Sequence, residues 1–483
     1  MKKHTLAFVL LLALASCRYV PFVNYYLPSS KTHFPTFSKW EKFVGSSENP
    51  LRASYDITCY DWQVSVNPKK ETIKANMAIQ FRVAKGEDSI MLDFQRKMKI
   101  TGIKSTYALK KWKRKGDVLF IIFNKNLIVN DLVKLEIAYE GRPATMLSEG
   151  PIFWKQDANK KPWISTITEG IGPHFIMPCK NLLYDEPDSC FIHLGVPKDL
   201  VGIANGKLDS ISTTANEKIY HWSVKNPMNI YNIAFYVGDY IKIEKPYTDI
   251  TGTKQAIQIY ALSYNKEKAE KAYEKTPRIM GYFEKIYGRF PWWKDGCKYV
   301  DSSTPAGGGM EHQSGISIGN VYQLDSSSAL YLITHELAHE WWGNSLTGYD
   351  YADAWLHEGF AEYSTALMFE HLYGTKGLNG YMGYALGNVH NKRPILKPYG
   401  VAYDSWVHGD DQDIYHKGAL LLHTIRMQMA NDPLFFSILK EAQLRFDRKN
   451  IHTSEFITFL TKKPGKTIVL TSICTLKRLT HLY

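Results

Sequence analysis

Apolar and polar residues alternate along the first half of the chain, and this pattern changes once. Between residues 52 and 245 the alternation has the two-residue period of a β-strand with one buried face. The apolar positions of 62–66 lead to the turn sequence at 67–70, and those of 77–83 lead back from it, which predicts a β-hairpin. We therefore expect an all-β N-terminal domain.

From about residue 265 the apolar spacing becomes helical. Helices are predicted at 266–275, 278–287, 331–342, 353–368, 414–429 and 434–446, and a short region of strand and glycine at 298–319 separates the second helix from the third. The pattern predicts a β domain at 51–247 and an α+β domain at 248–466. A chain of 483 residues, 45% of them hydrophobic, can form two or three cores.

The third and fourth predicted helices carry a pattern of metal ligands. His335 and His339 are four positions apart on one helix face, so both imidazoles can reach one ion, and Glu336 lies beside them. Glu358, nineteen positions after His339, is the predicted third ligand. Three protein ligands leave a fourth position for water, which is typical of a catalytic zinc. So short a motif can arise by chance, but the uninterrupted helix around it argues against chance.

Glu362 and two further segments have compositions that suit an active site. Glu362 lies one helical turn after Glu358, where it either supports that ligand or is an ordinary carboxylate at the edge of the core. Residues 305–312 contain three consecutive glycines, which suit close approach of the backbone to a ligand and also suit a tight loop or strand edge. Tyr415 opens a predicted helix, but spacing alone does not distinguish it among 31 tyrosines.

Together, these motifs resemble those of the gluzincin aminopeptidases, the group that includes membrane alanyl aminopeptidase and leukotriene hydrolase. The resemblance rests on H-E-x-x-H followed by eighteen residues and Glu358, on Gly-x-Met-Glu at Gly308–Glu311, and on Tyr-x-Lys-Gly at Tyr415–Gly418. Order and spacing agree, and the resemblance extends over about residues 50–465. It implies a multidomain fold in which an all-β, saddle-like N-terminal domain precedes a thermolysin-like α+β zinc peptidase domain.

The resemblance also implies the catalytic roles. One Zn²⁺ per chain, held by His335, His339 and Glu358, would polarise the scissile carbonyl and acidify a water molecule. Glu336 is then the general base, and Tyr415 donates a hydrogen bond to the oxyanion.

The same resemblance implies how the substrate binds. Glu311 is the expected anchor for a free α-amino group, in a substrate-binding segment with Gly308, Gly309 and Met310, and Glu169 is a second candidate anchor from a weaker match. The expected function is a zinc aminopeptidase acting on peptides with a free N-terminus. Two alternatives stay open: a hydrolase of the same scaffold with another substrate, such as an epoxide or an internal peptide bond, and a tethered binding protein with impaired catalysis.

Two positions depart from the family pattern. The chain has His312 after Glu311 and His357 before Glu358, where the family commonly has asparagine. Neither change replaces a ligand or the base. We expect both histidines to form hydrogen bonds rather than to bind the metal, so the departures bear on substrate preference more than on the chemistry.

The N-terminus resembles a bacterial lipoprotein signal. A short positive region precedes an apolar segment too short to span a bilayer, and small residues precede Cys17. We expect residues 1–16 to be a signal peptide, Cys17 to be lipidated, and residues 17–50 to form a tether. Arg18 resembles outer-membrane sorting, so the expected location is the cell envelope, anchored by lipid in the outer membrane. An ordinary cleaved secretory signal is the alternative.

Charge adds one further hypothesis. The net charge is +12, and the one dense basic run is Lys110–Lys115. Such a run suits nucleic acid or anionic lipid, but the turn sequence at 116–117 and the strand-like residues 118–123 favour a solvated hairpin end. We expect no nucleic-acid partner.

The cysteines and the C-terminal residues complete the sequence. Without Cys17 five cysteines remain, so not all can pair; one or two disulfides are compatible with this number, and Cys179 and Cys190 are the closest in sequence. Residues 467–483 have no clear amphipathic period. We interpret them as an atypical tail, truncated or frame-shifted, which would leave the cleft without a wall.

Overall fold

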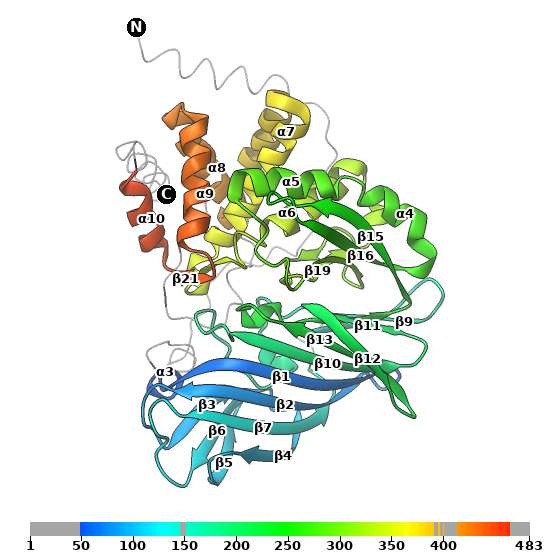
Figure 1. The fold of residues 1–483 in the computed structure, drawn as a ribbon, viewed down its shortest axis with the longest axis vertical. Coiled ribbons are helices and arrows are strands. Elements are labelled where there is room, and N and C mark those ends of the chain that lie inside the picture. Colours follow the sequence, from blue (N-terminus) through cyan, green and yellow to red (C-terminus); the bar gives the residue numbers. More distant parts are fainter. Residues whose placement is uncertain (1–48, 145–150, 391–394, 397–398, 400–412, 464–483) are drawn as a thin grey trace.

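A computed structural model of the protein describes residues 49–144, 151–390, 395–396, 399 and 413–463. The expected signal peptide, Cys17, nearly all of the expected tether and the tail at 467–483 lie outside these residues. In Figure 1, a lobe made of β-sheets lies below a lobe that carries the long helices.

The largest sheet of the β lobe has seven strands in the order β12-β13-β10-β1-β2-β7-β4. Its strands are β1 (Tyr55–Asn67), β2 (Thr72–Val83), β4 (Lys99–Ser105), β7 (Leu132–Gly141), β10 (Ser189–Pro197), β12 (Lys207–Thr213) and β13 (Glu217–Val224). The predicted hairpin is the antiparallel pair β1–β2, in which Trp62 lies opposite Met77. The apolar side chains of the predicted alternation are buried, so the hairpin is confirmed.

Two smaller sheets complete this lobe. They contain β3 (Ser89–Asp93), β6 (Val118–Phe123) and β5 (Leu109–Lys115) in one sheet, and β11 (Val201–Ala204), β14 (Phe235–Gly238), β9 (Pro162–Thr166) and β8 (Ile152–Gln156) in the other. The rings of Trp62 and Phe235 pack with centroids 5.7 Å apart, and the Trp62 indole donates to the Tyr139 hydroxyl at 2.8 Å. The Trp62–Phe235 contact joins two of the sheets, and buried residues of all three sheets belong to one apolar core, which confirms the all-β N-terminal fold.

The basic run at Lys110–Lys115 lies in β5, which pairs with β6 across the turn at 116–117. The predicted hairpin is therefore confirmed, although the run forms the strand itself rather than the hairpin end. Most side chains of β5 are exposed because it is the edge strand of its sheet. Charges on an edge strand prevent further strands from pairing with it.

The helical lobe contains a five-stranded sheet in the order β15-β16-β17-β19-β18. Its strands are β15 (Tyr240–Thr248), β16 (Lys254–Leu262), β17 (Cys297–Ser302), β18 (Gly309–Met310) and β19 (Ile316–Gly319). β15 pairs only with β16, so this strand belongs to the helical lobe, and the expected division at residue 248 falls at its end. Alternation along a strand marks the strand but does not identify the sheet it joins.

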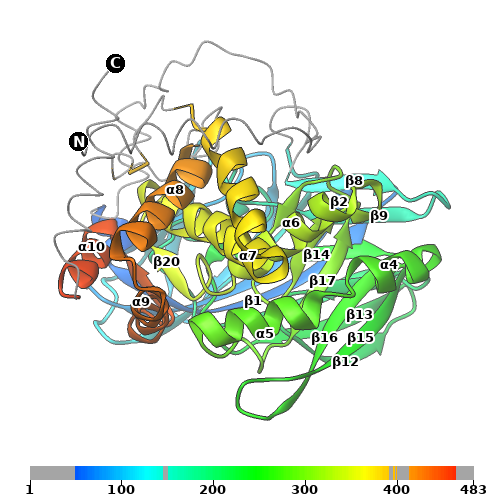
Figure 2. The ribbon, with the colours of Figure 1, turned by 90° about the horizontal axis from the view of Figure 1, so that it is seen from above.

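Helices pack against this sheet and against one another. They are α4 (Lys266–Ala272), α5 (Thr276–Tyr287), α6 (Ser326–Ala338), α7 (Trp355–Gly387), α8 (Asp413–Met429), α9 (Asp432–Arg445) and α10 (Thr453–Thr461), with the short α3 (Pro50–Ala53) before β1. Short 3₁₀ turns are η1 (Pro173–Phe175), η2 (Ile230–Asn232), η3 (Ser263–Asn265), η4 (Val321–Gln323) and η5 (Tyr351–Asp353), and β20 (Leu346–Gly348) pairs with β21 (Lys449–Ile451). Figure 2 shows α7 and α8 side by side. None of the described helices is long and apolar enough to cross a membrane.

Two predicted helices have the wrong boundaries. α6 begins five residues before the predicted start, because the Asp325 side chain caps it by accepting from the backbone N–H groups of Ser327 and Ser328. It ends at Ala338, since residues 339–342 form a turn. α7 continues past the predicted end to Gly387, across a non-helical Gly374 with φ 66° and ψ −161°.

The described cysteines carry free thiols. Cys179 and Cys190 are both buried and do not pair, so this candidate disulfide is not formed. Cys17 and Cys474 lie outside the described residues.

Candidate metal centre

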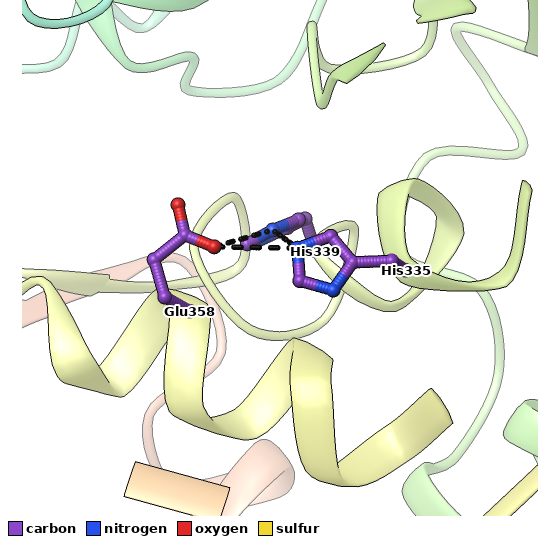
Figure 3. Close-up of side chains that lie close together, drawn as sticks. All are labelled: His335, His339 and Glu358. Atoms are coloured by element: carbon purple, nitrogen blue, oxygen red, sulfur yellow. Dashed lines mark hydrogen bonds and ion pairs between the residues drawn. The ribbon is translucent and has the colours of Figure 1, made fainter. Parts of the chain in front are cut away.

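Three side chains from two helices converge on one point. His335 lies on α6, His339 follows its last residue, and Glu358 lies in the first turn of α7. The two Nε2 atoms are 3.1 Å apart, and Glu358 Oε2 lies 3.3 Å from that of His335 and 3.4 Å from that of His339. Figure 3 shows the three side chains pointing toward one another, and all three are buried.

This triangle fits zinc. Bonds of about 2.0–2.1 Å at tetrahedral angles place ligand atoms about 3.3 Å apart. The His339 Nδ1–H donates to the backbone carbonyl of Trp342 at 3.0 Å, which leaves Nε2 with a free lone pair on the side of the triangle. The residues that the motif predicts as ligands are therefore brought together with the right donor set and spacing.

Glu362 supports the triangle from behind. Its carboxylate lies 3.5 Å from His335 Nδ1, and it accepts hydrogen bonds from His416 Nδ1 at 2.9 Å and from the Tyr331 hydroxyl at 3.1 Å. Burial alone would raise the pKa of Glu362, but the facing imidazoles of His335 and His416 outweigh it and hold the pKa well below its usual range. Glu362 is thus a buried carboxylate that orients a ligand, the supporting role considered from the sequence.

Glu336 lies beside the triangle, against the glycine segment. Burial raises the pKa of Glu336 to about 7, although His335 and His339 act in the opposite direction. A Cβ at Gly309 would lie 2.1 Å from Glu336 Oε1, so only glycine lets strand β18 approach this carboxylate. The glycine segment is therefore part of the site rather than a remote loop.

Glu311, which follows β18, lies in the same cluster of potential metal-binding groups as Glu336 and His339. It accepts a hydrogen bond from the Tyr231 hydroxyl at 2.9 Å, and Asn344 donates to its backbone carbonyl at 2.8 Å. Burial raises the pKa of Glu311 well above its usual value, and the nearby charge of Glu169 raises it further. Glu169 is half-buried in the loop after β9, so the β lobe contributes a second carboxylate to the site.

Sequence reasoning did not identify Tyr231 or Asn344. Tyr231 lies in η2 of the β lobe, far from every motif, and one tyrosine among 31 carries no signal. Asn344 lies two residues after the end of the predicted helix 331–342 and belongs to no motif. Its side chain also donates to Glu340 at 3.1 Å, so it joins the end of α6 to the segment that carries Glu311.

Tyr415, on α8, lies next to the ligand His335. Its ring stacks on His335 with centroids 6.1 Å apart and an angle of 23° between the ring planes. Burial raises the pKa of the Tyr415 phenol well above its usual value, and the charges of Glu358 and Glu169 raise it further, so the hydroxyl stays protonated. The backbones of α7 and α8 touch nearby: a Cβ at Gly418 would lie 2.8 Å from Gly359 Cα.

His312 and His357 form hydrogen bonds, as expected. His312 Nδ1 pairs with the Tyr236 hydroxyl at 2.5 Å, and burial lowers the pKa of His312 to about 3. His357 Nε2 accepts from the backbone N–H of Gly348 at 2.7 Å. Neither histidine joins a cluster of potential metal ligands within the described ranges.

Comparison with known families agrees with this site. The peptidase family M1 domain matches residues 271–475, and the peptidase M1 N-terminal domain matches residues 57–231. The chain belongs to peptidase family M1. Family membership gives zinc as the cofactor, and the two-domain fold expected from the sequence is confirmed.

Individual proteins resemble this M1 peptidase over most of its length. It is 26% identical over 400 residues to leukotriene A-4 hydrolase of Xenopus laevis, covering 77% of this chain and 62% of the relative. It is 24% identical over 364 residues to aminopeptidase B of Rattus norvegicus, covering 71% and 52%. The chain thus spans less than two thirds of the length of these relatives.

Solved structures share the fold. The M1 zinc metallopeptidase of Deinococcus radiodurans has a TM-score of 0.72 at 19% identity, covering 90% of this chain and 97% of that one. A mutant of the same protein bound to the substrate Tyr-Ser-Ala has a TM-score of 0.73 at 18% identity, covering 89% and 96%.

The close approach of Gly309 to Glu336 predicts that a methyl group added at Gly309 lowers the activity of this M1 peptidase far more than one added at Gly308. Gly309→Ala should displace the Glu336 carboxylate and lower kcat by about 10²-fold or more, the scale of a lost general base. Gly308→Ala is the matched control, because its Cβ would come no closer than 3.3 Å to any neighbour, the Pro305 carbonyl, and would not meet Glu336. Steady-state kinetics and zinc content measure both variants. Equal activities would show that Glu336 moves freely there.

Proposed function

We propose that the protein is a zinc-dependent aminopeptidase that hydrolyses the N-terminal peptide bond of peptides. The observation that carries the proposal is the pair of carboxylates, Glu311 and Glu169, which lie beside the base and the ligand triangle but are not part of the triangle. An ammonium group desolvated in a cleft needs such a partner, and this requirement selects substrates with a free N-terminus.

In this proposal His335, His339 and Glu358 hold the ion. Bound zinc supplies a Lewis acid for the scissile carbonyl and lowers the pKa of the attacking water. Glu362 and the Trp342 carbonyl fix the two imidazole rings from behind, so the ligands are oriented before the ion binds.

Glu336 and Tyr415 carry the proton transfer and the hydrogen bond to the substrate oxygen. Glu336 takes a proton from water and returns it to the leaving amine, a task suited to a carboxyl with a pKa near 7. The Tyr415 hydroxyl remains protonated, so it can donate to the oxygen on which negative charge develops.

We propose further that Cys17 is lipidated and tethers the enzyme in the cell envelope, at the outer membrane. The support is the apolar segment and the small residues before Cys17. The substrates would then be peptides that reach the envelope.

The Glu336→Gln substitution tests the chemistry. We expect wild-type protein to hydrolyse an amino-acid amide but not its N-acetylated form, and the substitution to lower the rate by about 10²- to 10⁴-fold with zinc content unchanged. Cleavage of both substrates at similar rates by the wild type would indicate an endopeptidase. Stoichiometric zinc without turnover of either would indicate a binding protein.

Glu311→Gln tests the amine anchor. Loss of a charge-assisted hydrogen bond, about 1.5–3 kcal/mol, should lower kcat/KM for the free amide by about 10- to 100-fold and weaken discrimination against the acetylated one. Glu169→Gln is the matched variant and should have a smaller effect, because Glu169 is only half-buried. Unchanged discrimination in both variants would mean that neither carboxylate binds the amine.

Cys17→Ala tests the tether. The wild-type protein should fractionate with outer membranes and incorporate labelled fatty acid, whereas the variant should do neither and keep its peptidase activity. Membrane association of the variant equal to that of the wild type would contradict the lipoprotein proposal.

A further inference from the structure

Two histidines face each other on the β lobe, away from the catalytic site. His193 of β10 and His221 of β13 are direct partners across neighbouring antiparallel strands, and their Nδ1 atoms are 2.7 Å apart. Their sheet neighbours Ile192 and Trp222 are buried in the lobe's core, whereas both imidazoles lie half-buried on the opposite face. Figure 1 shows β12, β13, β10 and β1 in succession there.

Each imidazole is held from its outer side. His193 Nε2 lies 3.3 Å from Asp61 Oδ1 on β1, and His221 Nε2 lies 2.8 Å from the Ser212 hydroxyl on β12. Metal-binding histidines commonly donate their second ring N–H to a carboxylate or another acceptor, which fixes the ring and the tautomer. In the structure the two Nδ1 atoms share an N–H···N hydrogen bond, and a change of tautomer in one ring would turn both Nδ1 lone pairs to the position between the strands.

A second carboxylate lies next to this pair. The β12–β13 pairing shifts register between Leu208 and Ser210, so Asp209 is the extra residue of a bulge beside His221. Asp209 is close enough for its charge to act on His221. The surroundings of the two imidazoles therefore favour a cation, apart from Lys134, whose ammonium pairs with Glu136 at 2.8 Å.

The 2.7 Å between the two Nδ1 atoms is the length of their hydrogen bond, and two nitrogens bound to one ion at a right angle would lie about as close together. Ligands at about 2.0 Å and at right angles are about 2.8 Å apart, whereas tetrahedral zinc ligands are about 3.3 Å apart. The catalytic triangle has the wider spacing, 3.1–3.4 Å, and the His193–His221 pair has the narrower one. Imidazole pairs at right angles suit Cu²⁺ and Ni²⁺, which favour tetragonal nitrogen coordination.

We propose that His193 and His221, oriented by Asp61 and Ser212, form a second metal site that binds Cu²⁺ or Ni²⁺. Binding needs both Nδ1 lone pairs, so the ring that carries the Nδ1–H loses this proton to solvent and takes one up at Nε2, and each bound imidazole stays neutral without any change of oxidation state. The ion bridges β10 and β13 at the surface of the β lobe. This site is independent of the peptidase proposal, because it shares no residue with it.

The test is a titration of the zinc-loaded full-length protein with Cu²⁺, buffered with glycine, followed by calorimetry and electron paramagnetic resonance. We expect one Cu²⁺ per chain in addition to the catalytic zinc, with nitrogen hyperfine splitting and a rise in Tm. His193→Ala and His221→Ala should each weaken this binding at least 100-fold. Asp61→Asn should weaken it about tenfold, the lower end of such outer-ligand effects.

His371→Ala is the matched control, because His371 is a surface histidine on α7 that stacks on Tyr282. It should bind Cu²⁺ as the wild type does. His221→Gln keeps a polar side chain on the strand, so a native Tm without the Cu²⁺-dependent rise would separate loss of the site from loss of folding. Absence of a second ion in the wild type, or equal binding by the His193→Ala/His221→Ala double variant, would overturn the proposal.

Discussion

The geometry of the catalytic site depends on one buried carboxylate, Glu362. It lies on α7, faces His335 and Tyr331 of α6, and accepts from His416 of α8. An unpaired carboxylate in this position would cost several kcal/mol, so the three helices must keep their partners around it. Because His335 and Glu358 belong to two of these helices, the same constraint fixes the ligand triangle that we propose for zinc.

The surroundings of four carboxylates in this site move their pKa values in different directions. Glu358 and Glu362 face imidazoles, and the pKa of each is held well below its usual range despite burial. Glu336 and Glu311 are buried beside other carboxylates, and burial raises the pKa of each. Neighbouring groups of the same type with pKa values moved in opposite directions are the usual basis for separate acid, base and ligand roles. The carboxylates that we assign to metal binding and to proton transfer divide in this way.

The sequence predicts the parts of this site that depend on local spacing. Two imidazoles one helical turn apart, the glycines beside Glu336 and the β1–β2 hairpin all follow from short patterns. Contacts between distant segments cannot be predicted from short patterns. Tyr231 donates to Glu311 although the two are 80 residues apart in the sequence. β15 alternates like the strands of the β lobe, yet it pairs within the five-stranded sheet of the helical lobe. Helix ends also escaped prediction where a side-chain cap such as Asp325 decides them.

The contact between Gly359 and Gly418 fixes the distance between α7 and α8 beside the ligand triangle. Where side chains fill the space between two helices, rotamer changes allow the distance between the helix axes to vary by fractions of an ångström. Here main-chain atoms of the two helices are in direct contact. Rotamer changes therefore cannot bring α7 and α8 closer together at this point. Glu358 lies on α7, one residue before Gly359, and Tyr415 lies on α8, three residues before Gly418. The distance from the Tyr415 hydroxyl to the ligand triangle is therefore set by this main-chain contact.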